Sequence, residues 1–151
     1  MQIWIDNDGC PGRMRDIVFK ASMRLSVPVI VVGNSYMHAP AGGLIKMVVV
    51  PGGFDAADQY IIEHVAPGHL VITSDIPLAS AIVAKGAFGL SSRGEEFNKE
   101  NVQERLAIRN LSAEIRSTGA LPGGPSALGA RDISKFASAF DRLITRLCKS
   151  S

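Results

Sequence analysis

Residues 3–8 have the sequence IWIDND, an apolar strand that runs directly into two acidic residues, Asp6 and Asp8. A second apolar run, Leu70 to Ser74, ends in the same way on Asp75. Apolar runs of this kind alternate with helical patterns along the chain, which predicts βαβ units and a parallel sheet. The carboxyl ends of parallel strands lie along one edge, where ligands of open α/β folds bind. We therefore expect these three acids to share that edge.

The rest of the chain continues the alternation. Strands are expected where short apolar runs stand between turn residues, at Gln2–Ile5, Val27–Val32, Ile45–Val50, Leu70–Thr73 and, as a short fifth strand, Ala87–Leu90. Helices are expected where apolar residues recur every three or four positions, at Pro11–Leu25, Asp55–Val65, Pro77–Lys85, Asn98–Ser117 and Asp132–Leu147. The segment Gly119–Gly129 is rich in glycine and proline, which predicts a loop. The sequence thus predicts an α/β fold, a three-layer αβα sandwich with helices on both faces of a parallel four- to five-stranded sheet.

Composition sets the broad class. With 151 residues, 46% of them hydrophobic and 20% charged, the chain fits one globular domain. No apolar run approaches the ~20 residues needed to cross a bilayer, so no membrane partner is expected. Asp6 and Asp8 interrupt any export signal, which predicts a cytoplasmic protein whose Cys10 and Cys148 stay reduced. The net charge of +2 permits a polyanionic partner without requiring one.

The aspartates have a simple explanation, because Asp is a preferred N-cap and these acids precede predicted helices. Asp55 and Asp58 could be a cap and a favourable charge in the first turn of a helix. However, only one residue can hold a cap position, so capping does not explain both Asp6 and Asp8. Asp55 and Asp58 are three residues apart and lie on one helix face, and Mg²⁺ prefers carboxylate oxygens. These arguments favour a metal site.

The order of the acidic segments resembles that of the YaiI/YqxD family of bacterial proteins. The segments are DNDGCP at 6–11, DAAD at 55–58 followed by Ile61, and LVITSDIPLA at 70–79, and shorter matches lie at Arg93-Gly94, Gly119, Gly124-Pro125 and Arg131-Asp132. Asn7 and Gly9 replace residues that are usually small and apolar in the family, but neither change removes a carboxylate. The family is described as of unknown function, and its members resemble PIN-like nuclease domains. The resemblance therefore implies a single PIN-like domain over residues 1–151.

A PIN-like domain implies hydrolysis of phosphodiesters in nucleic acid, RNA more than DNA, with Mg²⁺ or Mn²⁺ as the cofactor. The resemblance implies a catalytic acidic cluster of Asp6, Asp8, Asp55, Asp58 and Asp75, with Asp6, Asp58 and Asp75 as the metal ligands.

Positive charge near the acidic cluster would bind the substrate, because phosphate neutralisation dominates nucleic-acid affinity. The candidate substrate-binding residues are Arg93, Arg105, Arg109 and Arg131. Arg105 and Arg109 fall on one helical stripe, whose alternative explanation is a solvated helix face diluted by Glu104 and Glu114.

Two other functions remain open. The first is a non-catalytic PIN-like domain that binds RNA or a protein. The second is a haloacid-dehalogenase-like phosphatase, in which Asp6 would be the nucleophile. Cys10 stands where Thr or Val is usual in such phosphatases, and the expected cap insertion is absent. Cys10 itself could be a nucleophile at a helix N-terminus, but no histidine base accompanies it, which favours a packing role.

Overall fold

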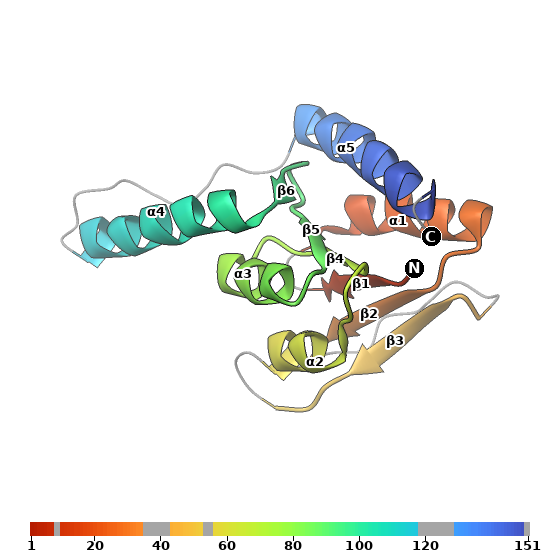
Figure 1. Cartoon of the computed structure of the whole chain (residues 1–151), viewed down its shortest axis with the longest axis horizontal. Coiled ribbons are helices and arrows are strands. Elements are labelled where there is room, and N and C mark those ends of the chain that lie inside the picture. The colour runs from red at the N-terminus through yellow and green to blue at the C-terminus, as the bar shows by residue number, and fades with distance from the viewer. Residues whose placement is uncertain (8–9, 35–42, 53–55, 118–128, 150–151) are drawn as a thin grey trace.

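A computed structural model describes residues 1–7, 10–34, 43–52, 56–117 and 129–149, without the side chains of 109–117 (Figure 1). Within these residues six strands form one sheet in the order β3-β2-β1-β4-β5-β6. The strands are β1 (Ile3–Asp6), β2 (Val29–Gly33), β3 (Ile45–Val49), β4 (Leu70–Ile72), β5 (Phe88–Leu90) and β6 (Glu96–Phe97). The first five are parallel, and β6 is antiparallel to β5.

Helices cover both faces of the sheet, as Figure 1 shows. On one face lie α1 (Gly12–Leu25) and α5 (Ala130–Lys149), whose apolar residues share a core with Ile3 and Ile5 of β1. On the other face lie α2 (Ala56–His64), α3 (Ile76–Ala84) and the start of α4 (Lys99–Ser117). Their core includes Trp4 of β1, because successive strand side chains point to opposite faces. None of the described helices is long and apolar enough to cross a membrane.

The predicted three-layer α/β sandwich is confirmed. The five predicted strands and five predicted helices are all present, with ends shifted by one or two residues. The predicted strand count was too low, because the two-residue β6 pairs with β5 through a hairpin and is too short for a periodic pattern. The sheet is therefore mostly parallel rather than fully parallel. The loop predicted at Gly119–Gly129 lies, except for Gly129, outside the described residues.

Candidate active site at the carboxyl edge of the sheet

The site lies where the strand order reverses. The chain passes from β1 outward to β2 and β3, and then returns to place β4 on the other side of β1. In open α/β sheets, ligands bind in the crevice outside the carboxyl ends of the strands at this switch point. Asp6 is the last residue of β1, and Thr73, Ser74 and Asp75 directly follow β4. The two acidic strand ends predicted from the sequence therefore lie next to each other.

Thr73 connects the two strand ends. Its hydroxyl donates a hydrogen bond to Asp6 Oδ2 at 2.9 Å and accepts one from the backbone N–H of Asp75 at 3.0 Å. Thr73 is fully buried and Asp6 is only 4% exposed. A buried carboxylate is unfavourable unless polar partners compensate for its lost hydration, and Thr73 is one such partner. One hydroxyl group therefore fixes the carboxylate of β1 relative to the backbone that follows β4.

Asp75 is the N-cap of α3. Its Oδ1 accepts a hydrogen bond from the backbone N–H of Leu78 at 3.0 Å. Capping is thus a real role of this residue, as the simpler explanation of the aspartates required. Asp75 is only partly buried, and among the described residues nothing donates to its other oxygen, Oδ2. The carboxylate can therefore cap the helix and still offer one oxygen to a ligand.

Of the other three candidate acids, Asp58 lies among the described residues. Asp58 lies in the first turn of α2, on the face of the sheet that also carries Trp4. Asp8 and Asp55 lie outside the described residues. Within the residues that are described, no group of three or more His, Cys, Asp or Glu side chains could hold a metal ion. The described part of the chain thus brings together Asp6 and Asp75 but does not complete the predicted cluster.

Arg15 and Asn7 border the site on the side of α1. The Arg15 guanidinium donates to Asn7 Oδ1 at 2.5 Å and to the Cys10 carbonyl at 3.4 Å. Gly33, at the end of β2, leaves room for Asn7, since a Cβ there would lie 3.0 Å from Asn7 Cβ. These contacts hold the chain at both ends of the turn between β1 and α1.

Cys10 is buried beside this turn. Burial raises the pKa of its thiol to about 12; Arg15 opposes this shift and Asp6 adds to it. The thiol donates to the Pro11 carbonyl, with an S···O distance of 3.8 Å. Because only the thiolate is a good nucleophile, this environment favours the packing role predicted for Cys10. Neither Cys10 nor Cys148 is in a disulfide.

The candidate substrate-binding arginines occupy two places. Arg93 follows β5 and forms an ion pair with Asp132 of α5 at 3.3 Å, and Arg131 is exposed in the first turn of α5. Arg105 lies on α4, where its guanidinium contacts both carboxylate oxygens of Glu95. The side chain of Arg109 lies outside the described residues.

A pair of serines connects the Arg93 loop to the site. Ser92 precedes Arg93, and its hydroxyl lies 2.8 Å from the Ser74 hydroxyl. Ser74 in turn precedes Asp75. Of the candidate arginines whose side chains the structure describes, Arg93 is therefore the one that hydrogen-bonded neighbours join to the acidic edge.

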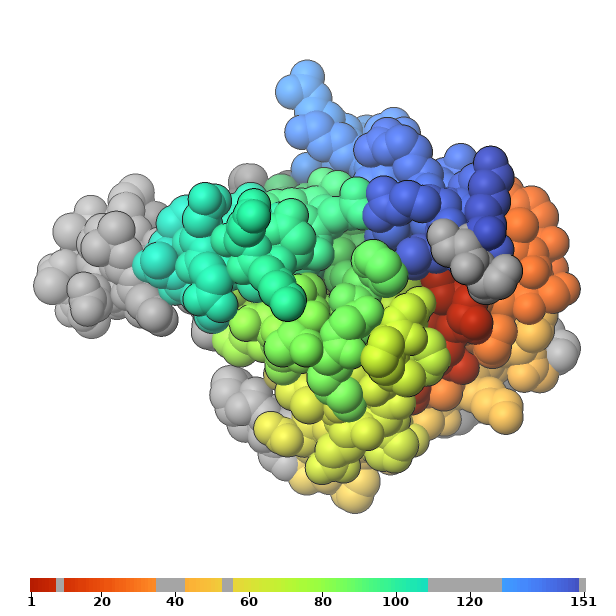
Figure 2. All heavy atoms as spheres, in the orientation of Figure 1, coloured from red at the N-terminus to blue at the C-terminus, as the bar shows by residue number. Residues whose placement is uncertain are grey.

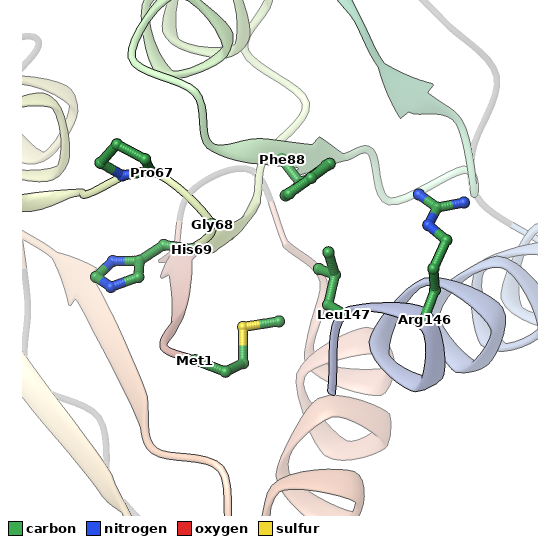
Figure 3. Close-up of a pocket in the computed structure, with 7 residues that line it drawn as sticks. All are labelled: Met1, Pro67, Gly68, His69, Phe88, Arg146 and Leu147. Carbon is green, nitrogen blue, oxygen red and sulfur yellow. The ribbon is translucent and has the colours of Figure 1, made fainter. Parts of the chain in front are cut away.

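A separate pocket lies at the opposite, amino edge of the sheet (Figure 3). It has a volume of about 420 Å³ and is lined by Met1, Pro67, Gly68, His69, Phe88, Arg146 and Leu147. These residues lie at the starts of β1, β4 and β5 and at the end of α5. The pocket is therefore separated from Asp6 and Asp75 by the length of the strands.

His69, at this amino edge, is held as a neutral ring. Its Nδ1 accepts hydrogen bonds from the Trp4 indole N–H at 3.1 Å and from the backbone N–H of Ala66 at 3.2 Å. Nδ1 therefore carries no proton in the folded protein, and protonation would break both hydrogen bonds. Burial lowers the pKa of His69 below its ordinary 6.5, and the positive N-terminal amine lowers it further.

We expect His69 to make the protein less stable in mild acid. Its pKa is lower in the folded than in the unfolded state, so the unfolded chain binds more protons as the pH falls below 6.5. The stabilisation is complete above that pH and is lost as the pH decreases through the window below it. Urea unfolding at about pH 7.5 and about pH 5 should show a smaller decrease in His69→Gln than in the wild type. An equal decrease in both proteins would contradict this assignment.

Comparison with known proteins identifies a family that the sequence of this chain matches. Residues 4–146 match a family model described as "Uncharacterized BCR, YaiI/YqxD family". The chain belongs to the YaiI/YqxD family. The resemblance predicted from the three acidic segments is therefore confirmed.

Relatives in the family match over nearly their full length. A protein of Citrifermentans bemidjiense named UPF0178 protein is 52% identical over 99% of this chain and 97% of its own. A relative of the same name from Geobacter metallireducens is 50% identical over 99% and 96% of the two chains. One from Pseudomonas fluorescens is 46% identical over the whole of both. No solved structure shows a significant match to this chain.

Proposed function

We propose that this YaiI/YqxD protein is a divalent-cation-dependent nuclease that hydrolyses phosphodiesters in RNA. One observation carries the proposal: the buried carboxylate of Asp6 ends β1 at the switch point of the sheet and is linked through Thr73 to Asp75. The resemblance of the family to PIN-like domains supports the same chemistry. We assign this activity to the cytoplasm, the compartment predicted from the sequence.

The donor set suits Mg²⁺ or Mn²⁺. Mg²⁺ is commonly held by one or two carboxylates, with water and substrate phosphate oxygens as the other ligands. Asp6 and Asp75 would supply the carboxylates, and Asp75 has an oxygen that α3 does not use. Asp8, Asp55 and Asp58 would add negative charge or hold metal-bound water. A bound cation would lower the pKa of a water molecule and neutralise charge on the phosphate.

The chain's own residues would hold this arrangement rigid. Thr73 fixes the orientation of the Asp6 carboxylate, and the same hydroxyl holds the backbone of Asp75. Arg15 binds the turn after β1 through Asn7 and Cys10. Hydrogen-bonded neighbours that orient a ligand group are important for metal affinity and activity, so these residues are positioning residues in the proposal.

A non-catalytic domain that binds RNA or a protein is the second candidate. One observation favours it: Asp75 already has a structural role as the N-cap of α3. In this alternative the acidic strand ends would stabilise the fold and would have no cation to bind.

Calorimetric titration with Mn²⁺ and Mg²⁺ separates the two candidates. We expect the wild type to bind cation, more tightly when a short single-stranded RNA is present, and to cleave that RNA only when cation is added. The double variant Asp6→Asn/Asp75→Asn should lose cation binding. No cation binding with or without RNA would make the non-catalytic domain the better conclusion. Turnover of a small phosphate ester without RNA cleavage would instead favour the phosphatase.

A further inference from the structure

The positive charge of the chain is concentrated on α5. This helix carries five basic residues and two acidic ones, a net charge of +3, whereas the rest of the chain has a net charge of −1. The apolar side of α5 is buried against the sheet and α1. Its polar side is exposed and includes Arg131, Ser134, Lys135, Ser138 and Arg142. Figure 2 shows α5, in blue, at the surface of the molecule.

A shallow groove lies between this helix and the loop that joins β5 to β6. It has a volume of about 420 Å³ and is lined by Arg93, Gly94, Ser134, Lys135, Ser138 and Arg142. Gly94 has φ +84°, and a Cβ at this position would lie 2.7 Å from the Lys135 carbonyl oxygen. Only glycine allows the loop to approach the helix backbone so closely. The loop and the helix, which are the two walls of the groove, therefore have fixed positions relative to each other. Arg93 of the loop and Lys135 of the helix both line the groove.

The acidic residues of α5 are already engaged. Asp132 accepts hydrogen bonds from Arg93 and from the backbone N–H of Gly129, and Asp141 pairs with Arg24 at 3.7 Å. In the part of the chain that the structure describes, no carboxylate oxygen lies within 4.0 Å of a charged nitrogen of Lys135 or Arg142. Lys135 and Arg142 are therefore available to bind an external anion, and the side chains of Ser134 and Ser138 are exposed beside them.

The spacing of the cations indicates an anion with repeated charges. Lys135 and Arg142 are seven residues apart, which is two helical turns or about 10 Å along the helix axis. Two cations at that separation suit two phosphates better than one. A volume of this size encloses about one drug-sized molecule, so it suits one or two nucleotides of a single strand rather than a double helix.

We propose that this groove, the α5 groove, binds the phosphate backbone of a single RNA strand on its way to the acidic edge. Lys135 and Arg142 would contact separate phosphates, and the hydroxyls of Ser134 and Ser138 would donate to phosphate oxygens. The path to the site runs along Arg93, Ser92 and Ser74, which precedes Asp75. The inference deepens the proposed function by naming a substrate-binding surface, and in this sense rests on it.

RNA binding without cleavage tests the α5 groove directly. Fluorescence anisotropy with a labelled oligouridylate, in EDTA and over a range of KCl concentrations, measures affinity and its salt dependence. We expect Lys135→Gln/Arg142→Gln to weaken binding by about tenfold per residue removed. The slope of log affinity against log salt should decrease by about 0.7 for each lost phosphate contact, about 1.4 in total.

The matched control is Lys20→Gln/Lys46→Gln, which removes the same charge from exposed positions on α1 and β3. Both double variants have a net charge of 0, so only the position of the lost charge differs. We expect the control to keep nearly the wild-type salt slope. Equal weakening in both double variants would overturn the proposal, as would equally tight binding of an RNA duplex or of polyglutamate.

The groove and the nuclease activity can fail separately. RNA binding in EDTA that depends on Lys135 and Arg142, without cleavage in Mn²⁺, would support the groove and refute the proposed nuclease. Cation-dependent cleavage with unchanged RNA affinity in the groove variant would support the nuclease and refute the groove.

Discussion

We expect Asp6→Asn to lower cation-dependent RNA cleavage by at least about a hundredfold, while the protein stays folded. Loss of a residue that only orients a metal ligand costs about 10- to 100-fold, and Asp6 is proposed to be a ligand itself. The amide has nearly the shape of the carboxylate and can still accept the hydrogen bond from Thr73. The change therefore removes the negative charge and keeps the size of the side chain and its acceptor for Thr73. Initial cleavage rates in Mn²⁺, together with circular dichroism, measure both parts of the prediction.

Asp16→Asn is the matched control for this variant. Asp16 lies exposed on α1, and its replacement makes the same chemical and charge change at a residue that does not end a strand. We expect it to keep the wild-type cleavage rate. If Asp6→Asn retained cleavage at the level of Asp16→Asn, Asp6 would be a structural acid and the proposed ligand set would be wrong.

The fold was largely predictable because its pattern is local. Alternating apolar strands and helices of period 3.6 indicate a parallel sheet without knowledge of distant contacts. The missed strand β6 has only two residues, Glu96 and Phe97, and no periodicity can identify so short an element. The feature that could have indicated β6 is Gly94 in the turn before this strand. Gly94 adopts a positive φ, and its N–H donates a hydrogen bond to the Ser91 carbonyl. A turn ending in such a glycine is a common hairpin connection.

The candidate site was predictable only in part. Acids that end strands are visible in the sequence, and the structure brings Asp6 and Asp75 to one edge. Thr73 was missed as a participant, because its partner Asp6 is 67 positions away in the chain. Arg105 has a partner that its helical spacing did not indicate. Helical spacing placed it on a basic stripe, but the β5–β6 hairpin brings Glu95 against its guanidinium.

The basic face of α5 was predicted only at Arg131, and Lys135 and Arg142 were missed for a different reason. The apolar stripe of this helix predicted correctly which side is buried, but the polar side beyond Arg131 then had no assigned role. Whether polar residues on an exposed helix face form a groove depends on what lies beside them. Here it depends on Gly94, whose missing side chain lets the loop approach the backbone at Lys135. Such tertiary contacts are not visible in the period of a sequence.

Thr73→Val should destabilise the protein by about 2–4 kcal/mol. Removing one partner of a buried hydrogen bond costs about 1–3 kcal/mol, and more where the partner is charged. Here one hydroxyl serves two partners, the carboxylate of Asp6 and the backbone N–H of Asp75, in a fully buried position. Valine has nearly the same shape as threonine, so the loss measures the hydroxyl rather than a cavity. Urea unfolding at neutral pH provides the measurement.

Thr145→Val is the control, because Thr145 lies exposed on α5 and the same substitution there should change stability by less than about 0.5 kcal/mol. A similarly small effect at Thr73 would mean that the link between the strand ends is unimportant for the fold.

The Thr73→Val variant also distinguishes a residue that positions Asp6 from a residue that contacts the cation or the substrate. Because Thr73 is proposed to orient Asp6 rather than to bind the cation, cleavage should fall by about 10- to 100-fold, less than in Asp6→Asn. A loss equal to that of Asp6→Asn would instead place the Thr73 hydroxyl among the groups that contact cation or substrate.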